Sequence, residues 1–339
     1  MVTKLGLDLG YANITLSDVS LGVHRIPSVA IIDKNTRRIV SIGNEALNYS
    51  GENGMLVRPF KNGMFYSADF TEAIIKESLK PFESAESIRC VVGVPDSINS
   101  KQEKELHSML TAAGVEECFF VKRAIAALIG AGYSPSISAV SVNVGASATE
   151  IAVLYQGDII YSRSCAIGGE DFDEAVSRYM LEQGELKISL QDARAIKEAI
   201  GAVWEGLNAP PINISGTLAL TGNTIKMSVS SEDILGVFEA PLHRLLSAIA
   251  DAVKKIPTDY VEEIFANGII LSGGGAKLFG LGKMISNVFS IDVSLAKYPT
   301  DCVARGLVLA NSFMPIKMRS NGKNVTANLK KYYNNSTKK

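Results

Sequence analysis

Short runs of hydrophobic residues, separated by polar turns, fill the first part of the chain. Runs rich in β-branched and aromatic residues predict strands over 4–16, 23–33, 38–43, 87–94 and 118–121. Hydrophobic positions that recur every three or four residues predict helices over 70–81, 101–113 and 124–132. This half of the chain therefore mixes strands with helices, as α/β folds do.

The same order of elements starts again at Ala139. Hydrophobic runs predict strands over 140–148, 150–155, 158–166, 212–217, 224–228 and 268–272, and helical spacing predicts helices over 171–183, 190–204, 231–255 and 279–289. Each half opens with a hydrophobic strand, a glycine turn and a series of short strands. We therefore expect a duplicated α/β fold with a ligand between the halves, where the strand ends and turns meet.

One polar residue interrupts the first hydrophobic strand. Asp8 stands in an otherwise hydrophobic run, directly before the turn Gly10–Asn13. A buried carboxylate is unfavourable unless a cation or a hydrogen-bond donor meets it. The segment Val140–Val153 repeats this design of strand and glycine turn, and a third glycine turn follows Ser272. Three such turns indicate a nucleotide held in a cleft.

Composition narrows the class of protein further. The 339 residues suffice for two domains, and 47% hydrophobic with 20% charged residues is typical of a globular protein. A net charge of -1 argues against a nucleic-acid partner. The four cysteines have no paired spacing, which predicts buried, reduced thiols. Because no hydrophobic run reaches transmembrane length and no leader segment is evident, the sequence predicts a cytoplasmic protein.

A series of short motifs resembles those of one protein family. In chain order they are Leu7–Asn13, Arg58–Gly63, Val92–Pro95, Ile129–Gly132, Ile167–Asp173, Ile196–Lys197, Ile200–Gly201, Leu271–Ala276 and Val303–Gly306. Through them, residues 3–312 resemble the MreB-like bacterial actins, the group of MreB, Mbl and MamK within the actin, chaperone and sugar-kinase ATPase superfamily. The sequence shows neither the inserted substrate domain of a sugar kinase nor a chaperone's substrate-binding domain after residue 312.

The resemblance implies an actin-like fold, with two duplicated α/β domains, each carrying a smaller subdomain, around a nucleotide cleft. It places domain I at 1–138 with a subdomain at about 33–74, and domain II at 139–300 with a subdomain at about 183–240. A helix at 301–315 returns to domain I. Residues 316–339 are rich in lysine and asparagine and contain no acidic residue, which predicts a flexible basic tail.

For the cleft, the resemblance implies a binding site for ATP or ADP. The residues at the family's nucleotide-contacting positions are Asp8, Gly10, Tyr11, Ala12, Asn13, Gly145, Ala146, Ser147, Gly168, Arg194, Lys197, Gly201, Gly273, Gly274, Gly275 and Ala276. In the family pattern Asp8 would also hold Mg²⁺ through a water molecule. The substitutions around Asp8 leave open whether this chain needs Mg²⁺.

Four positions of this pocket depart from the family pattern. Tyr11 replaces a threonine at the terminal phosphate, and Asn143 replaces the second metal-binding aspartate. Arg123 replaces the glutamate that positions the attacking water, and Arg194 replaces a glutamate on the helix beside the nucleoside. Arginine stays protonated and cannot act as a base. No catalytic set is intact, and the sequence predicts weak or absent ATP hydrolysis.

The function implied by the resemblance is that of a cytoskeletal protein in cell shape, forming or modulating filaments with its own copies or with an MreB paralogue. Two alternatives stay open: an active ATP-hydrolysing, polymerising homologue, and a non-polymerising adaptor similar to the pilus-assembly protein PilM. The basic tail is either a solvated terminus or an attachment to anionic lipid at a membrane surface. An acidic partner in the shape machinery would use the same charges.

Overall fold

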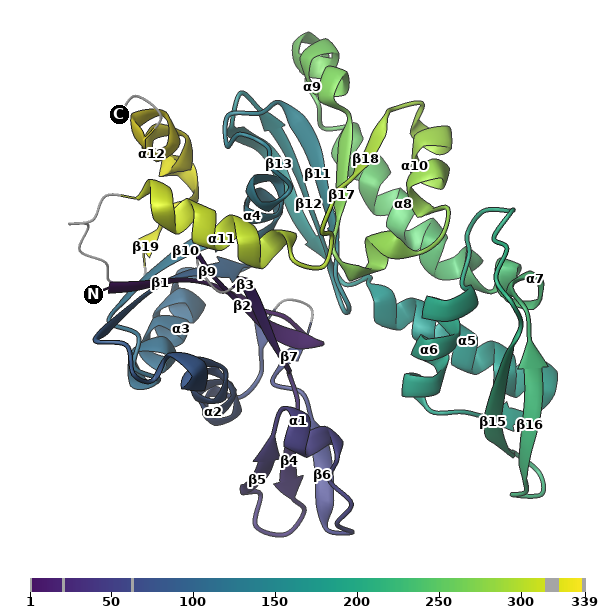
Figure 1. Ribbon diagram of the computed structural model, residues 1–339. Helices are drawn as coiled ribbons and strands as arrows, with labels where there is room; N and C mark the ends of the chain where they lie inside the picture. The colour runs from purple at the N-terminus through teal and green to yellow at the C-terminus, as the bar shows by residue number, and fades with distance from the viewer. Residues whose placement is uncertain (1, 20–21, 62–63, 315–322, 337–339) are drawn as a thin grey trace.

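Two β-sheets, one in each half of the chain, carry the fold (Figure 1). The computed structural model describes residues 2–19, 22–61, 64–314 and 323–336. In spatial order, the first sheet consists of β19 (Lys323–Asn324), β10 (Glu117–Lys122), β9 (Ser87–Val94), β1 (Val2–Leu9), β2 (Asn13–Asp18) and β3 (Gly22–Pro27). The second consists of β13 (Asp158–Cys165), β12 (Thr149–Tyr155), β11 (Ala139–Val144), β17 (Ile269–Ser272) and β18 (Val293–Leu295).

Helices cover the outer faces of both sheets and fill the space between them (Figure 1). On the outer face of the first sheet lie α2 (Ala68–Leu79) and α3 (Ser100–Ala112). On the outer face of the second lie α5 (Gly169–Gly184), α8 (Glu239–Val253), α9 (Val261–Asn267) and α10 (Leu281–Phe289). Between the sheets lie α4 (Arg123–Gly130) and α11 (Cys302–Phe313). The two sheets therefore share a central helical layer.

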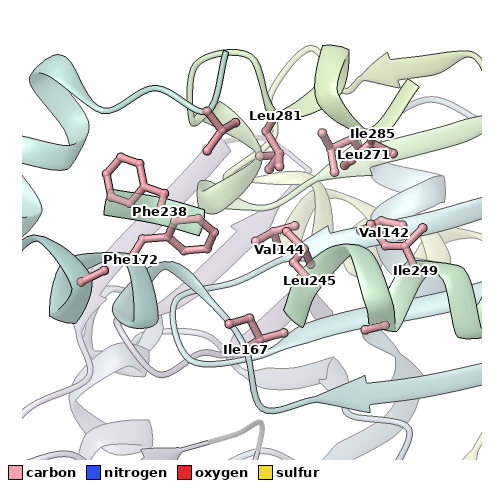
Figure 2. Packing of buried hydrophobic residues seen from close by; sticks show 14 of the residues in the cluster. Val142, Val144, Ile167, Phe172, Phe238, Leu245, Ile249, Leu271, Leu281 and Ile285 are labelled. Atoms are coloured by element: carbon pink, nitrogen blue, oxygen red, sulfur yellow. The ribbon is translucent and has the colours of Figure 1, made fainter. Parts of the chain in front are cut away.

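Alternation along the strands decides which layer each side chain meets. In β1 the leucines at positions 5, 7 and 9 face the outer core with α2 and α3. In β11 the valines at positions 140, 142 and 144 face the outer core of the second sheet. Figure 2 shows Val142 and Val144 in this core. The residues between them face the central layer. Asp8 and Asn143 are thereby both directed towards α4 and α11, at the ends of their strands.

Two small subdomains extend from the sheets (Figure 1). The first contains β4 (Ala30–Asp33), β5 (Ile39–Ile42), α1 (Asn44–Leu47) and β6 (Gly54–Val57), and the short hairpin of β7 (Phe60–Lys61) and β8 (Met64–Phe65) leads back to α2. The second contains β14 (Leu186–Lys187), α6 (Leu190–Ile200), β15 (Ile212–Leu218), β16 (Thr224–Val229) and α7 (Ser231–Ile234). The expected division into domains and subdomains remains a prediction.

Several elements are shorter than the hydrophobic pattern predicts. The run 23–33 is divided between β3 and β4, which belong to different sheets, and the strand predicted over 140–148 ends at Val144. The run 4–16 is split by the glycine turn between β1 and β2. The helix predicted over 190–204 ends at Ile200, because Gly201 adopts an extended conformation. The helix predicted over 231–255 is interrupted by a 3₁₀ turn at Leu235–Phe238. Pro241 then stands in the first turn of α8, where the missing backbone N–H is not needed.

Residues 323–336 form a strand and a helix, so the prediction of a flexible tail is wrong for this part of the chain. Strand β19 pairs in parallel with β10, and the Val325 N–H donates to the Phe120 carbonyl at 2.9 Å. The helix α12 (Leu329–Ser336) then packs on α11, with Leu329 buried. Two apolar residues outweigh the polar composition here. The rest of the predicted tail lies outside the described residues.

All four cysteines are buried and free, as their spacing predicts. Burial raises the pKa of the Cys90 thiol, which disfavours its reactive thiolate form. Across the part of the chain that the structure describes, no helix is both long enough and hydrophobic enough to cross a bilayer.

Helices α4 and α11 cross at two glycines. A Cβ atom on Gly306 would lie 1.8 Å from the Ala126 carbonyl oxygen, and one on Gly130 would lie 1.8 Å from the Cys302 carbonyl oxygen. Such contacts are far inside van der Waals separation, so only glycine permits this approach of the two backbones. These glycines belong to the motifs Ile129–Gly132 and Val303–Gly306, whose role here is therefore helix packing.

We expect Gly306→Ala to lower the free energy of unfolding by about 3 kcal/mol, because the helices must move apart. The midpoint of urea unfolding measures this change. Gly236→Ala is the matched control, because a Cβ there meets nothing within 4 Å. We expect this control to stay within about 0.5 kcal/mol of the wild type. Equal midpoints for the two variants would contradict the packing argument.

Candidate functional site

Each of the two sheets carries a glycine turn, and the two turns have the same geometry. In the first, the Gly10 N–H donates to the Asn13 carbonyl at 3.1 Å, and in the second the Gly145 N–H donates to the Ala148 carbonyl at 2.9 Å. Each turn joins two antiparallel strands, and the pairs Asp8↔Thr15 and Asn143↔Glu150 stand in equivalent registers. The sequence duplication is therefore a duplication of backbone geometry.

A cleft of about 620 Å³ lies between these turns, within the range of small-molecule sites. Its wall includes the predicted residues Ala12, Asn13, Gly145, Ala146, Arg194, Lys197, Gly201, Gly274 and Gly275. The other predicted residues, Asp8, Gly10, Tyr11, Ser147, Gly168, Gly273 and Ala276, lie beside these in the chain and are not on the wall. The wall also includes Gly169, Phe172, Glu198, Ala199, Leu207, Lys277, Leu278, Phe279 and Thr300, which sequence reasoning missed.

Two basic side chains on one wall of the cleft are fixed by a single buried carboxylate. Lys197 Nζ lies 2.6 Å from Asp173 Oδ1, and Arg194 Nε lies 3.1 Å from Asp173 Oδ2. Lys197 also donates to the Gly169 carbonyl at 3.0 Å. Asp173 is only 1% exposed, so α5 holds both cations of α6 at the cleft. Its position in the motif Ile167–Asp173 was the available signal for this role.

The third glycine turn packs against the second. Gly273 has a φ of 87°, and a Cβ on it would lie 2.2 Å from the Val144 carbonyl oxygen. Gly273 therefore serves the junction between β17 and β11. Gly274, in contrast, lines the cleft and has space for a Cβ, with only Thr300 Cγ2 at 3.8 Å. Gly275 combines the two roles, because it lines the cleft and a Cβ on it would lie 2.4 Å from Val144 Cγ1.

Arg123 is buried at the strand ends and binds the carboxylate of Asp8. Its Nε lies 2.9 Å from Asp8 Oδ1, and its Nη2 donates to the Leu9 carbonyl at 2.7 Å. A longer contact of 3.8 Å joins Nη1 to Glu150 Oε1. Arg123 is the first residue of α4, so the start of that helix delivers a cation to the point where Asp8 leaves β1.

Burial raises the pKa of Glu150 from 4.5 to about 7, although the Arg123 charge and the Ser164 hydroxyl favour its ionised form. Ser164 Oγ donates to Glu150 Oε1 at 3.1 Å. Glu150 is 4% exposed and stands opposite Asn143 in the sheet. Because the guanidinium lies closer to Asp8, Asp8 is its main partner and Glu150 a secondary one.

A divalent metal ion does not fit these residues as they stand. Asp8 is engaged by the guanidinium, and the second position is the neutral amide of Asn143, whose Oδ1 accepts from Ser272 Oγ at 3.2 Å. Mg²⁺ prefers anionic oxygen ligands and bound water. Within the described ranges, no group of three or more histidine, cysteine, aspartate or glutamate side chains could hold a metal ion.

Tyr11 connects the two domains. Its hydroxyl donates a short hydrogen bond to Glu170 Oε1, at the start of α5. The Arg58 guanidinium carbon lies 4.9 Å from the centre of the Tyr11 ring, and Arg58 Nη1 donates to the Tyr11 carbonyl at 3.2 Å. Burial and the contact with Glu170 raise the pKa of Tyr11 to about 12, so its hydroxyl keeps its proton. The first turn is thereby tied to the domain across the cleft.

The sequence as a whole matches the model of the MreB/Mbl protein family over residues 2–317. The chain belongs to the MreB/Mbl family. Mbl of Bacillus cereus (strain ATCC 10987) is 30% identical over 319 residues, which cover 91% of this chain and 96% of that protein. MreB of Escherichia coli K12 is 30% identical over 316 residues, covering 89% and 91%. Both relatives are named cell shape-determining proteins.

Solved structures confirm the actin-like fold of this MreB/Mbl protein. MreB5 of Spiroplasma citri, bound to AMPPNP, matches with a TM-score of 0.84 and 22% identity, over 90% of this chain and 95% of that one. MamK, in a double helical filament, matches with a TM-score of 0.80 and 20% identity, over 93% of this chain and 100% of that one. At these identities the likeness establishes the fold.

The raised pKa of Glu150 predicts a pH dependence of stability. Between about pH 4.5 and 7 the folded protein keeps a proton on Glu150 that the unfolded chain has lost. The slope of the free energy of unfolding is therefore negative, and stability from this group declines as the pH rises through that window, by at most about 3 kcal/mol.

Glu150→Gln removes this titration. We expect the stability of the variant relative to the wild type to increase as the pH rises from about 5 to about 8. Urea unfolding of both proteins across that range measures the difference, in which the other titrating groups cancel. Glu182→Gln, at an exposed glutamate, is expected to follow the wild type at each pH. A constant difference between Glu150→Gln and the wild type would contradict the raised pKa.

Proposed function

We propose that this MreB/Mbl-family protein forms actin-like filaments that act in cell shape, and that it binds ATP or ADP in the cleft with weak or absent hydrolysis. The observation that carries the proposal is the cleft itself. Two geometrically matched glycine turns, a third glycine turn and two fixed cations converge on about 620 Å³.

Nucleotide binding is supported by the chemistry of the cleft wall. Glycine turns at strand ends let backbone N–H groups approach phosphate closely. Arg194 and Lys197 add positive charge, and the glycines at 274 and 275 leave space for a nucleoside. The fold neighbour MreB5 of Spiroplasma citri has been solved with AMPPNP and with ADP.

Weak hydrolysis is supported by Arg123, which stands at the family position of the glutamate that positions the attacking water. Arg123 replaces a carboxylate with a guanidinium, and a guanidinium does not orient water by accepting its proton. Phosphoryl transfer depends on positioning of the attacking water and on charge stabilisation, both of which carboxylates and their metal ion provide in this fold. Asn143 removes a second carboxylate from the same place.

Filament formation is supported by the relatives. MamK has been solved as a double helical filament, and the curated relatives are cell shape-determining proteins. A head-to-tail contact between different surfaces of identical subunits does not close on itself and produces a filament. A cytoplasmic location, with a basic C-terminal segment available to a membrane surface or to an acidic partner, fits this role.

Calorimetric titration with ADP, together with electron microscopy at rising protein concentration, tests the proposal. We expect binding and filaments for the wild type. Gly274 lines the cleft, and a Cβ there meets only Thr300 Cγ2 at 3.8 Å. We therefore expect Gly274→Leu to obstruct the cleft and to weaken ADP binding by about a hundredfold, through loss of roughly 3 kcal/mol. Gly236→Leu, at an exposed site away from the cleft, should bind like the wild type. Binding without filaments would instead favour the adaptor alternative.

The hydrolysis part has its own test. We expect the combined variant Tyr11→Thr, Arg123→Glu and Asn143→Asp to release phosphate at least about tenfold faster than the wild type, equal to about 1.4 kcal/mol in the barrier. Phosphate release from ATP with Mg²⁺ measures this rate, and circular dichroism checks that the variant is folded. Equal rates in a folded variant, or rapid release by the wild type, would contradict the assignment of these residues.

A further inference from the structure

Resting on the proposed nucleotide site, we propose that this cleft binds its nucleotide without a divalent cation, because the guanidinium of Arg123 permanently occupies the charge position next to Asp8. Arg123 is thereby the residue that determines whether the site requires a metal ion.

The first argument is that the guanidinium of Arg123 has several oxygen partners. The guanidinium meets Asp8 at 2.9 Å, the Leu9 carbonyl at 2.7 Å and Glu150 at 3.8 Å. Its side chain is 8% exposed, and it projects from the first residue of a buried helix. A bound cation with several oxygen partners, held by the backbone of α4, is a fixed part of the fold.

The second argument is what a divalent ion would meet at this place. An ion approaching Asp8 would face a like charge within a few ångströms, in a region with little water to screen it. The second ligand position offers only the amide of Asn143, which already accepts from Ser272. Both differences from a metal-binding arrangement disfavour a divalent ion, because Arg123 adds a cation and Asn143 stands where a carboxylate would be.

The third argument is that phosphate charge has other partners here. Arg123 compensates the negative charge of Asp8, which would otherwise repel phosphate. On the cleft wall, Arg194 and Lys197 are held by one buried carboxylate, Asp173, and Glu198 adds a second negative charge. Lys277 lines the same cleft. The wall is therefore suited to an anion that arrives without its metal ion.

The experiment is calorimetric titration of the wild-type protein with ADP, once in excess EDTA and once in excess magnesium chloride. We expect dissociation constants that agree within about twofold. ADP binding that is more than about tenfold tighter with Mg²⁺ would overturn the inference while leaving the proposed nucleotide site intact. Absence of ADP binding in both buffers would overturn the proposed site and this inference together.

Two variants identify the residue responsible. Arg123→Glu should make ADP binding at least about tenfold tighter with Mg²⁺ than with EDTA. Mg²⁺ alone should raise the melting temperature of this variant, because the ion then joins three carboxylates. Arg123→Lys keeps the positive charge and should remain indifferent to Mg²⁺. An Arg123→Glu protein that folds and still ignores Mg²⁺ would contradict the role of Arg123.

Asn143→Asp covers the case in which Arg123→Glu does not fold. This variant restores the second carboxylate but leaves the guanidinium on Asp8, and we expect its ADP binding to stay indifferent to Mg²⁺. Dependence on Mg²⁺ in Asn143→Asp would show that the amide, and not Arg123, sets the metal requirement.

Discussion

The ion pair between Arg123 and Asp8 is the interaction on which the phosphate end of the cleft depends. A carboxylate at the end of a buried strand needs a cation, and α4 supplies one from its first residue at 2.9 Å. Removal of Asp8 would leave the guanidinium of Arg123, whose side chain is 8% exposed, without its main partner, a change that costs about 3–5 kcal/mol for a buried charge. The same pair links β1 to α4, which belongs to the helical layer between the two sheets. The contact that compensates the charge of Asp8 therefore also joins the first sheet to this layer.

The surrounding substitutions form a consistent set around this pair. Asn143 removes the charge that a second cation would require, and Ser272 satisfies its amide oxygen. Tyr11 reaches across to Glu170 and carries the Arg58 guanidinium on its ring, which ties the first turn to the second domain. Side chains thus provide contacts across the cleft. The glycine turns of the cleft wall, in contrast, keep their geometry.

Much of the fold was predictable from local patterns. Hydrophobic alternation and the repeat of strand and glycine turn predicted the duplicated α/β arrangement, and the motif series predicted the family. Errors arose where single residues override a pattern. Gly201 ends α6 early, and a 3₁₀ turn precedes Pro241. In the C-terminal segment, Val325 and Leu329 find a sheet edge and a helix to pack on, which composition cannot reveal.

By itself, the sequence determined the repeated strand and glycine turn, because residue type and spacing along a strand decide which side chains are buried. Through its motifs it also predicted that Asp8, Tyr11, Arg123 and Asn143 share one pocket, but none of the four is on the cleft wall. Only the tertiary structure decided which partners they take: Arg123 binds carboxylates and not the open cleft, and Asp173 holds the two cations of α6. The reason is that these contacts join residues from 21 to 115 positions apart. Their distances follow from the packing of separate elements, which no local pattern encodes.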